Sequence, residues 1–215
     1  MALIAISSGT YYHIETLEGA RAPRVWDAVL PPEALPDATL DPADAIFIPC
    51  RSPAQRLVAV APALRAHLDR GGTVVAMGES RSDLWLPGVV FTPCPTNWWW
   101  WLEPGADLGV RVAAPAHPLM AGLDAAAVTW HLHGHFDPPA GAEVLIRDAD
   151  DLAVAYLDAV TTPGRMVVTS LDPCYHHGSH FMPATTRFLA AFLPALRNWA
   201  VEGAPAPTTC PDAQG

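Results

Sequence analysis

The chain has 215 residues, of which 51% are hydrophobic, and this is enough for a single domain with a sizeable core. Its formal net charge of -10 argues against a nucleic-acid partner or an anionic membrane surface, because both need clustered basic side chains. The four cysteines lie far apart and form no C-x-x-C pair, which is typical of a reducing compartment. With no signal peptide or membrane span predicted, we expect a cytoplasmic protein.

The first half of the chain alternates predicted strands with predicted helices. Residues 2–6, 44–49 and 73–77 are short apolar runs typical of buried strands. Residues 11–17 and 54–69 have helical signals, and a Gly-Gly pair ends the second of these helices. This order of elements indicates a parallel α/β unit with right-handed crossovers.

The second half predicts several short strands separated by Pro and Gly turns, which extend the sheet or form an antiparallel edge on it. These strands are expected at residues 98–101, 108–112, 128–132, 144–146 and 152–156. A further buried strand at 164–171 is followed by polar residues, and a last amphipathic helix covers 181–199. We expect one domain over residues 1–200 and a flexible tail over 201–215.

Polar side chains follow three of the predicted parallel strands. Because ligands bind beyond the carboxyl ends of such strands, Arg51, Glu79, Asp172 and His176 should converge on one pocket. The candidate ligand-binding residues are Cys50, Arg51, Ser52, Gly78, Glu79, Ser80, Asp172, His176 and His177. Asp172, His176 and Glu79 are also the candidates for catalysis.

Each of these candidates has a structural alternative. Asp172 is typical of a residue that caps the turn before Tyr175 or His176, and Glu79 of a charge at a helix N-terminus. Cys50 is typical of a buried thiol that behaves as a small hydrophobic group. The charged residues at the strand ends could also neutralise one another as a purely structural network.

The segment His131-Leu132-His133-Gly134-His135 predicts a metal site, because residues two apart on a strand share a face. Three imidazoles suit zinc, iron or copper, so the possible cofactor is one divalent transition metal ion. The alternative is a strand end whose histidines bind loop carbonyls. His176, His177 and His180, with Asp172, form a second cluster, and the sequence leaves open whether the two clusters meet.

Residues 98–101 are four consecutive tryptophans. Aromatic faces suit the apolar faces of sugar rings, but packing or a subunit interface also explains them. We expect a homo-oligomer or a subunit of a hetero-complex.

The order of parts resembles the class I glutamine amidotransferase-like fold, a flavodoxin-like three-layer sandwich. The resemblance is to its non-amidotransferase branch, which includes trehalose-utilisation-type proteins and β-galactosidase trimerisation domains. The family's G-x-C-x-G elbow matches residues 76–80, which places Gly78 where the thiol would be, and its H-P-E signature matches Asp172-Pro173-Cys174. Pro49-Cys50-Arg51-Ser52 replaces its oxyanion loop. The resemblance therefore implies no glutamine hydrolysis by the family mechanism.

Two hypotheses for function remain. The first is a non-catalytic amidotransferase-like domain that binds a small ligand or a partner subunit at the carboxyl edge of the sheet. The alternative is a metal-dependent hydrolase that acts on a carbohydrate or amide through its histidine clusters. Stoichiometric metal is required only by the second hypothesis.

Overall fold

Five parallel strands form the first half of a mixed sheet, in the order β2-β1-β3-β4-β10. The structure is a computed structural model that describes residues 1–105 and 107–202. The parallel strands are β1 (Leu3–Ile6), β2 (Ala28–Leu30), β3 (Ala45–Ile48), β4 (Thr73–Ala76) and β10 (Arg165–Thr169). Strands β1, β3 and β4 are buried along their whole length, because helices cover both faces of this part of the sheet.

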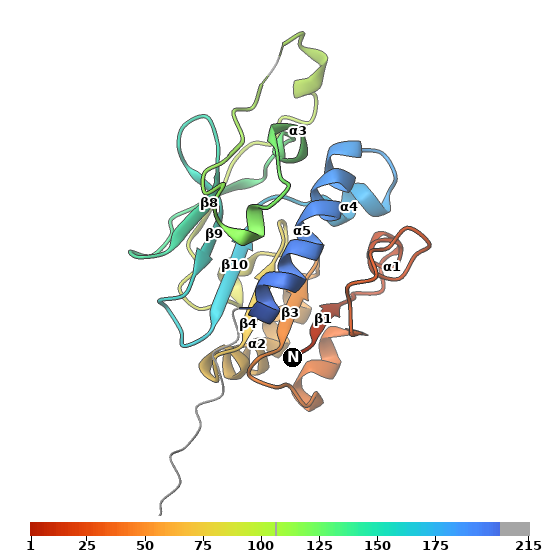
Figure 1. Cartoon of the computed structure of the whole chain (residues 1–215), viewed down its shortest axis with the longest axis vertical. Coiled ribbons are helices and arrows are strands. Elements are labelled where there is room, and N and C mark those ends of the chain that lie inside the picture. Colours follow the sequence, from red (N-terminus) through yellow and green to blue (C-terminus); the bar gives the residue numbers. More distant parts are fainter. Residues whose placement is uncertain (106, 203–215) are drawn as a thin grey trace, which may run out of the picture.

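The helices form the outer layers. They are α1 (Tyr11–Leu17), α2 (Ala54–Asp69), α3 (Ala125–Val128), α4 (Pro173–Gly178) and α5 (Pro183–Glu202). Alternate residues of β1 face opposite layers: Leu3 lies in one buried cluster with Phe188 of α5, whereas Ile4 lies in another with Leu57 of α2. Helices α1, α4 and α5 lie side by side (Figure 1). The predicted three-layer α/β sandwich is therefore confirmed.

Antiparallel strands extend the sheet beyond β10, as expected for the second half of the chain. They are β5 (Phe91–Pro93), β6 (Arg111–Val112), β7 (Gly134–Phe136), β8 (Glu143–Arg147) and β9 (Ala153–Asp158). Strand β9 pairs with β10 and β8, and its start also pairs with β7. Strand β7 in turn pairs with β5, and β8 with β6.

Two of the predicted strands are wrong. Residues 98 and 99 form a turn that leads into the 3-10 helix η3 (Trp100–Leu102). Val128 ends the short helix α3, and residues 129–132 follow it without strand pairing. Val128 and Trp130 are apolar because they are buried in the core beside α5, where Trp130 packs edge-on against Phe188. Short apolar runs do not distinguish a strand from any other buried segment.

The remaining regular elements are short. Three further 3-10 helices are η1 (Pro32–Asp37), η2 (Ser82–Leu84) and η4 (Pro118–Met120). Among the described residues, no helix combines the length and apolar character needed to cross a membrane. The predicted tail, from residue 203 onward and including Cys210, lies outside the described residues.

Candidate functional site

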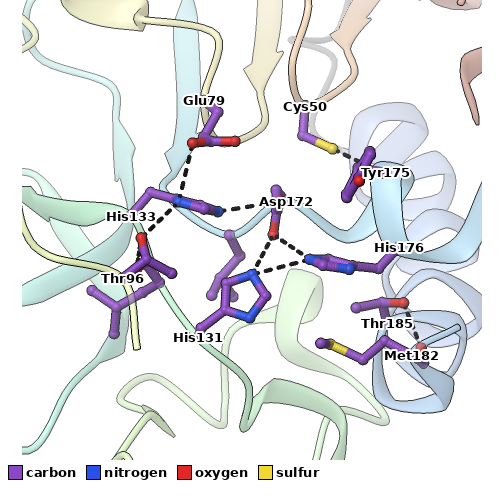
Figure 2. A network of polar contacts seen from close by, with 12 residues as sticks. Cys50, Glu79, Thr96, His131, His133, Asp172, Tyr175, His176, Met182 and Thr185 are labelled. Carbon is purple, nitrogen blue, oxygen red and sulfur yellow. Dashed lines mark hydrogen bonds and ion pairs between the residues drawn. The ribbon is translucent and has the colours of Figure 1, made fainter. Parts of the chain in front are cut away.

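Asp172 is the centre of a buried polar cluster at the carboxyl edge of the parallel strands (Figure 2). It follows β10, and its side chain is fully buried. Its Oδ2 accepts hydrogen bonds from Nε and Nη2 of Arg51 at 3.1 and 2.9 Å. Asp172 precedes α4, but its side chain makes no capping hydrogen bond there, so the capping alternative is wrong.

Arg51 and Glu79 reach this cluster from the ends of β3 and β4. The Arg51 guanidinium lies 2.9 Å from Glu79 Oε2 and stacks on the ring of Tyr175, 3.7 Å from its centroid. The backbone of both residues has the left-handed conformation, with φ of 57° for Arg51 and 56° for Glu79. Such strain costs about 1–3 kcal/mol per residue and concentrates at functional sites. Arg51, Glu79, Asp172 and His176 therefore meet in one polar cluster, although only Arg51 and His176 also line the adjoining cavity.

Two histidines complete a triangle of ligand atoms with Asp172. His131 Nε2 lies 3.0 Å from His176 Nε2, and Asp172 Oδ1 lies 3.6 and 3.2 Å from those two nitrogens respectively. All three side chains are buried, and Oδ1 has no hydrogen-bond partner among the described residues. The two histidine clusters therefore meet, through one member of each, at a set of atoms that could hold a metal ion.

His133 lies between the carboxylates of Glu79 and Asp172. Its Nδ1 is 3.2 Å from Glu79 Oε1, and its Nε2 is 3.2 Å from Asp172 Oδ2. The Thr96 hydroxyl also lies 3.1 Å from Nδ1. A side chain between two carboxylates can hold a proton and pass it between them.

The surroundings favour an ionised Asp172 and a neutral His131. Burial raises the pKa of Asp172, but the imidazoles of His131, His133 and His176, which lie 3.2–3.6 Å from its oxygens, outweigh it and hold the pKa well below its usual range. Burial lowers the pKa of His131, and this outweighs the opposing effect of Asp172. A carboxylate and a neutral imidazole are the forms that bind metals.

The thiols near the site are poorly suited to nucleophilic chemistry. Cys50 and Cys174 are fully buried, and the Tyr175 backbone amide donates to Cys50 Sγ at 3.1 Å. Burial and the neighbouring Cys174 raise the pKa of the Cys50 thiol well above its usual range. A protonated thiol is a weak nucleophile.

In the turn after β4, the residue at the nucleophile position is one place later than the comparison with the G-x-C-x-G motif predicted. In a strained elbow the nucleophile has the left-handed conformation, and in this turn that residue is Glu79, not Gly78. Gly78 instead makes a close approach, since a Cβ there would lie 2.2 Å from the Ser170 carbonyl oxygen. A carboxylate therefore occupies the exposed position of the elbow.

A cavity of about 1030 Å³ adjoins the cluster. His131 and His176 reach it from the cluster, and the ring of Trp98 lies 4.5 Å from that of His131. Further aromatic walls come from Trp99, Trp100, Trp130, Tyr175 and Phe181. The side chain of Trp101 lies outside the described residues. These aromatic side chains thus bound the space next to the candidate metal ligands, instead of forming a strand.

The structure separates His135 from the two histidines with which it was grouped. Its Nε2 lies 2.6 Å from Asp148 Oδ2, whereas His131 and His133 face Asp172. The predicted trio assumed an alternating strand, but β7 begins only at Gly134. The side chains close enough to share one metal ion are therefore not the predicted trio but His131, Asp172 and His176, or Glu79, His133 and Asp172.

Other candidate residues have local structural contacts. His177 Nδ1 lies 2.9 Å from the Thr186 hydroxyl, and His180 Nε2 lies 3.6 Å from Glu15. The Ser52 and Ser80 hydroxyls donate to carbonyl oxygens three residues earlier, and so stabilise the turns after β3 and β4. Their predicted part in ligand binding stays a prediction.

Sequence reasoning missed several residues of the site. Thr96, Trp130, Tyr175 and Arg187 were not proposed as site residues, although each contacts the cluster or lines the cavity. Tyr175 is the one with a signal in the sequence, because it lies between Asp172 and His176 at a strand end. The others come from segments whose positions depend on tertiary packing.

Comparisons with known proteins show the fold. No family model matches the chain, and no curated protein matches it by sequence. A glutamine amidotransferase from Thermotoga maritima is 10% identical and has a TM-score of 0.53, over 93% of this chain and 96% of that one. A ThuA-like protein from Bacteroides uniformis is 13% identical with a TM-score of 0.49, over 95% and 92% of the two chains.

A larger enzyme contains a similar unit. An exo-β-1,4-mannosidase from Opitutaceae bacterium strain TAV5 is 11% identical with a TM-score of 0.48, over 88% of this chain and 35% of that one. At these identities the similarities describe architecture alone. The chain has the class I glutamine amidotransferase-like fold that its sequence led us to expect.

Proposed function

We propose that this protein is a metal-dependent hydrolase that acts on a carbohydrate or amide substrate. His131, Asp172 and His176 hold one divalent transition metal ion at the inner end of the aromatic cavity. The observation that carries the proposal is the triangle of two imidazole nitrogens and one carboxylate oxygen, 3.0, 3.2 and 3.6 Å apart.

The donor set suits such an ion. Ligand atoms bound at about 2.1 Å in tetrahedral or octahedral geometry lie about 3.0–3.4 Å apart, close to the observed spacing. Without an ion, two imidazole nitrogens and a carboxylate oxygen lie close together in a buried place with no cation between them, because Arg51 contacts only the other oxygen of Asp172. Asp172 Oδ1, which is buried and lacks a hydrogen bond among the described residues, is the atom most in need of a cation.

When bound, the ion would supply Lewis acidity and would lower the pKa of a coordinated water. The chain itself orients and neutralises the groups around it. Arg51 fixes the Asp172 carboxylate through Oδ2, which leaves Oδ1 directed at the two imidazoles. Glu79 and His133, 3.2 Å apart, can exchange a proton with each other and with Asp172, whose Oδ2 lies 3.2 Å from His133 Nε2.

Metal content tests the proposal directly. Protein purified without a His-tag should contain about one transition metal ion per chain by mass spectrometry, whereas His131→Ala and His176→Ala should each lose most of it. His180→Asn is the matched control, because His180 is paired with Glu15 outside the cluster and asparagine tolerates its left-handed backbone. Metal-free wild-type protein, or variants that keep the ion, would contradict the proposal.

A second candidate function keeps the cavity but needs no ion. In it the domain binds a small ligand or a partner subunit without catalysis, and the polar cluster is structural. The observation that favours it is that Arg51 already pairs with both Asp172 and Glu79, at 2.9 Å in each case. A folded, metal-free protein that binds ligands in the cavity would support this candidate over the first.

Both candidates share one negative expectation. Because the pKa of the Cys50 thiol is raised and a carboxylate occupies the elbow, we expect no release of ammonia from glutamine. Glutaminase activity that is lost in Cys50→Ala or Cys174→Ala would show that a thiol at another strand end acts as the nucleophile.

A further inference from the structure

The charges around the cavity are unlike those of the chain as a whole. The protein carries a net charge of -10, yet the described residues that line the cavity include two arginines and two histidines and no Asp or Glu. Asp172 and Glu79 belong to the polar cluster itself and are not part of this lining. A cavity of this composition attracts anions and disfavours cations.

The two arginines differ in how far they are neutralised. Arg51 is paired with Asp172 and Glu79, so its charge belongs to the polar cluster. Arg187 has no carboxylate within ion-pair distance among the described residues. Its Nη2 donates a hydrogen bond to the Ala126 carbonyl oxygen at 3.0 Å. Its guanidinium therefore keeps several N–H donors and a full positive charge for a ligand.

The position of Arg187 strengthens this effect. It lies one turn into α5, a helix of 20 residues, and Pro183 and Ala184 at the start of the same helix also line the cavity. The positive end of the helix dipole therefore points toward the same space. Both features would stabilise a negatively charged group of a ligand at this end of the cavity.

The rest of the wall is apolar and flat. Trp98, Trp99 and Trp100 come from one segment, Tyr175 from α4 and Phe181 from the loop that follows it. Aromatic side chains recognise flat or apolar ring faces, while a single charged group fixes the orientation of the ligand.

We propose that the cavity binds an anionic substrate with a flat, apolar body, and that Arg187 binds the acidic group. In this arrangement the body of the ligand lies along the tryptophans, and its other end reaches His131 and His176. The inference rests on the proposed function only in calling the ligand a substrate. Recognition of the anion by Arg187 does not require the metal.

A pair of fluorescent probes tests the inference. 8-Anilinonaphthalene-1-sulfonate and N-phenyl-1-naphthylamine share one ring system, and only the first carries a negative charge. Titrated into metal-free protein, the sulfonate should bind about tenfold or more tightly than the amine. Arg187→Ala should remove most of this difference by weakening the sulfonate alone.

Arg70→Ala is the matched control, because Arg70 is also exposed and without an ion pair among the described residues, but follows α2 away from the cavity. It should leave both affinities unchanged. Equal affinities for the two probes, or an Arg187→Ala effect no larger than that of Arg70→Ala, would overturn the inference. Since the titration uses metal-free protein, a failed metal assay and a failed probe assay are distinguished.

Discussion

The site is assembled from two regions that differ in how they are held. The parallel half of the sheet contributes Arg51, Glu79 and Asp172, each directly after a buried strand. The segment between β5 and β7 contributes Trp98, His131 and His133, and it contains little regular structure apart from short helices and the two-residue strand β6. The first region supplies charged groups in a fixed frame, and the second supplies imidazoles and the aromatic wall.

Backbone hydrogen bonds explain the difference. In the parallel half, the Arg51 amide donates to the Gly78 carbonyl at 3.0 Å and the Gly78 amide to the Leu171 carbonyl at 2.8 Å, so the three strand ends are tied to one another. The loop that carries His133 is tied more sparsely, by the Cys94 amide to the His133 carbonyl at 3.2 Å. Changes in the first region should therefore affect stability, and changes in the second mainly binding.

Asp172→Ala should have the largest effect on stability. It removes a buried carboxylate and leaves Arg51 without one of its two carboxylate partners, which should lower the free energy of unfolding by about 3–4 kcal/mol. His131→Ala, in the second region, should cost about 1–2 kcal/mol. Urea unfolding followed by tryptophan fluorescence measures both. Equal losses would remove the proposed contrast between the two regions.

Gly78→Ala tests the close approach of the strand ends. A Cβ at this position would lie 2.2 and 2.7 Å from the carbonyl oxygens of Ser170 and Leu171, which are backbone atoms that cannot move aside. We expect a loss of about 2–3 kcal/mol. The control is Gly105→Ala in the second region, where nothing lies within 4 Å but φ is +75°, so about 1 kcal/mol should be lost. A larger loss at Gly105 would contradict the contrast.

Sequence reasoning was most successful where local signals and the topology agree. The helix at Ala54–Asp69 was predicted with its observed bounds, because apolar spacing and the terminal Gly-Gly pair both mark it. Four of the five parallel strands were predicted because apolar runs of four or five residues between turn signals suit a sheet covered on both faces, whereas β2, with three half-buried residues in a Pro-rich stretch, was missed. The convergence of Arg51, Glu79 and Asp172 followed from that topology alone.

The second region could not be predicted in the same way. Trp98, Trp99 and Trp100 line a cavity, and Val128 and Trp130 are buried without strand partners. Periodicity carries no signal for either situation. The contact of His131 with His176 depends on how an irregular segment packs over the strand end at Asp172, 41 residues later in the chain. Short-range spacing instead suggested His135 as a partner of His131.

Stability should fall in mild acid, and buried histidines of the first region contribute to this. Burial lowers the pKa of His67, whose Nε2 bonds the Asp44 carbonyl, below its ordinary value of 6.5. The unfolded chain therefore takes up a proton first as the pH falls through 6.5, so folded stability is present above that pH and is lost below it. The slope for one proton is at most about 1.4 kcal/mol per pH unit.

His67→Gln isolates this contribution. The variant should be less stable at pH 8 but should show a shallower loss between pH 6.5 and 5, as measured by urea unfolding across that range. His180→Asn, at an exposed position in the loop before α5, is the control for the loss of one histidine. An unchanged slope in His67→Gln would mean that His67 titrates alike in the folded and unfolded chains.

The smallest effect on stability is expected on the aromatic surface of the second region. Trp98, Trp99, Leu102 and Phe181 are all exposed, with 65% of the Trp99 surface accessible to solvent. Apolar side chains gathered in this way are typical of surfaces that are covered by another molecule. We therefore expect wild-type protein to self-associate through this segment, and light scattering at micromolar concentration should detect an oligomer.

Trp99→Ser should shift that equilibrium toward the monomer, while changing the free energy of unfolding at low protein concentration by no more than about 0.5 kcal/mol. Leu84→Ser is the matched control, because Leu84 is 52% exposed but lies in η2, outside the aromatic segment. A wild-type monomer would show that the tryptophans serve the cavity alone. If Leu84→Ser also produced a monomer, the contact between copies would instead involve η2. This element packs against α2.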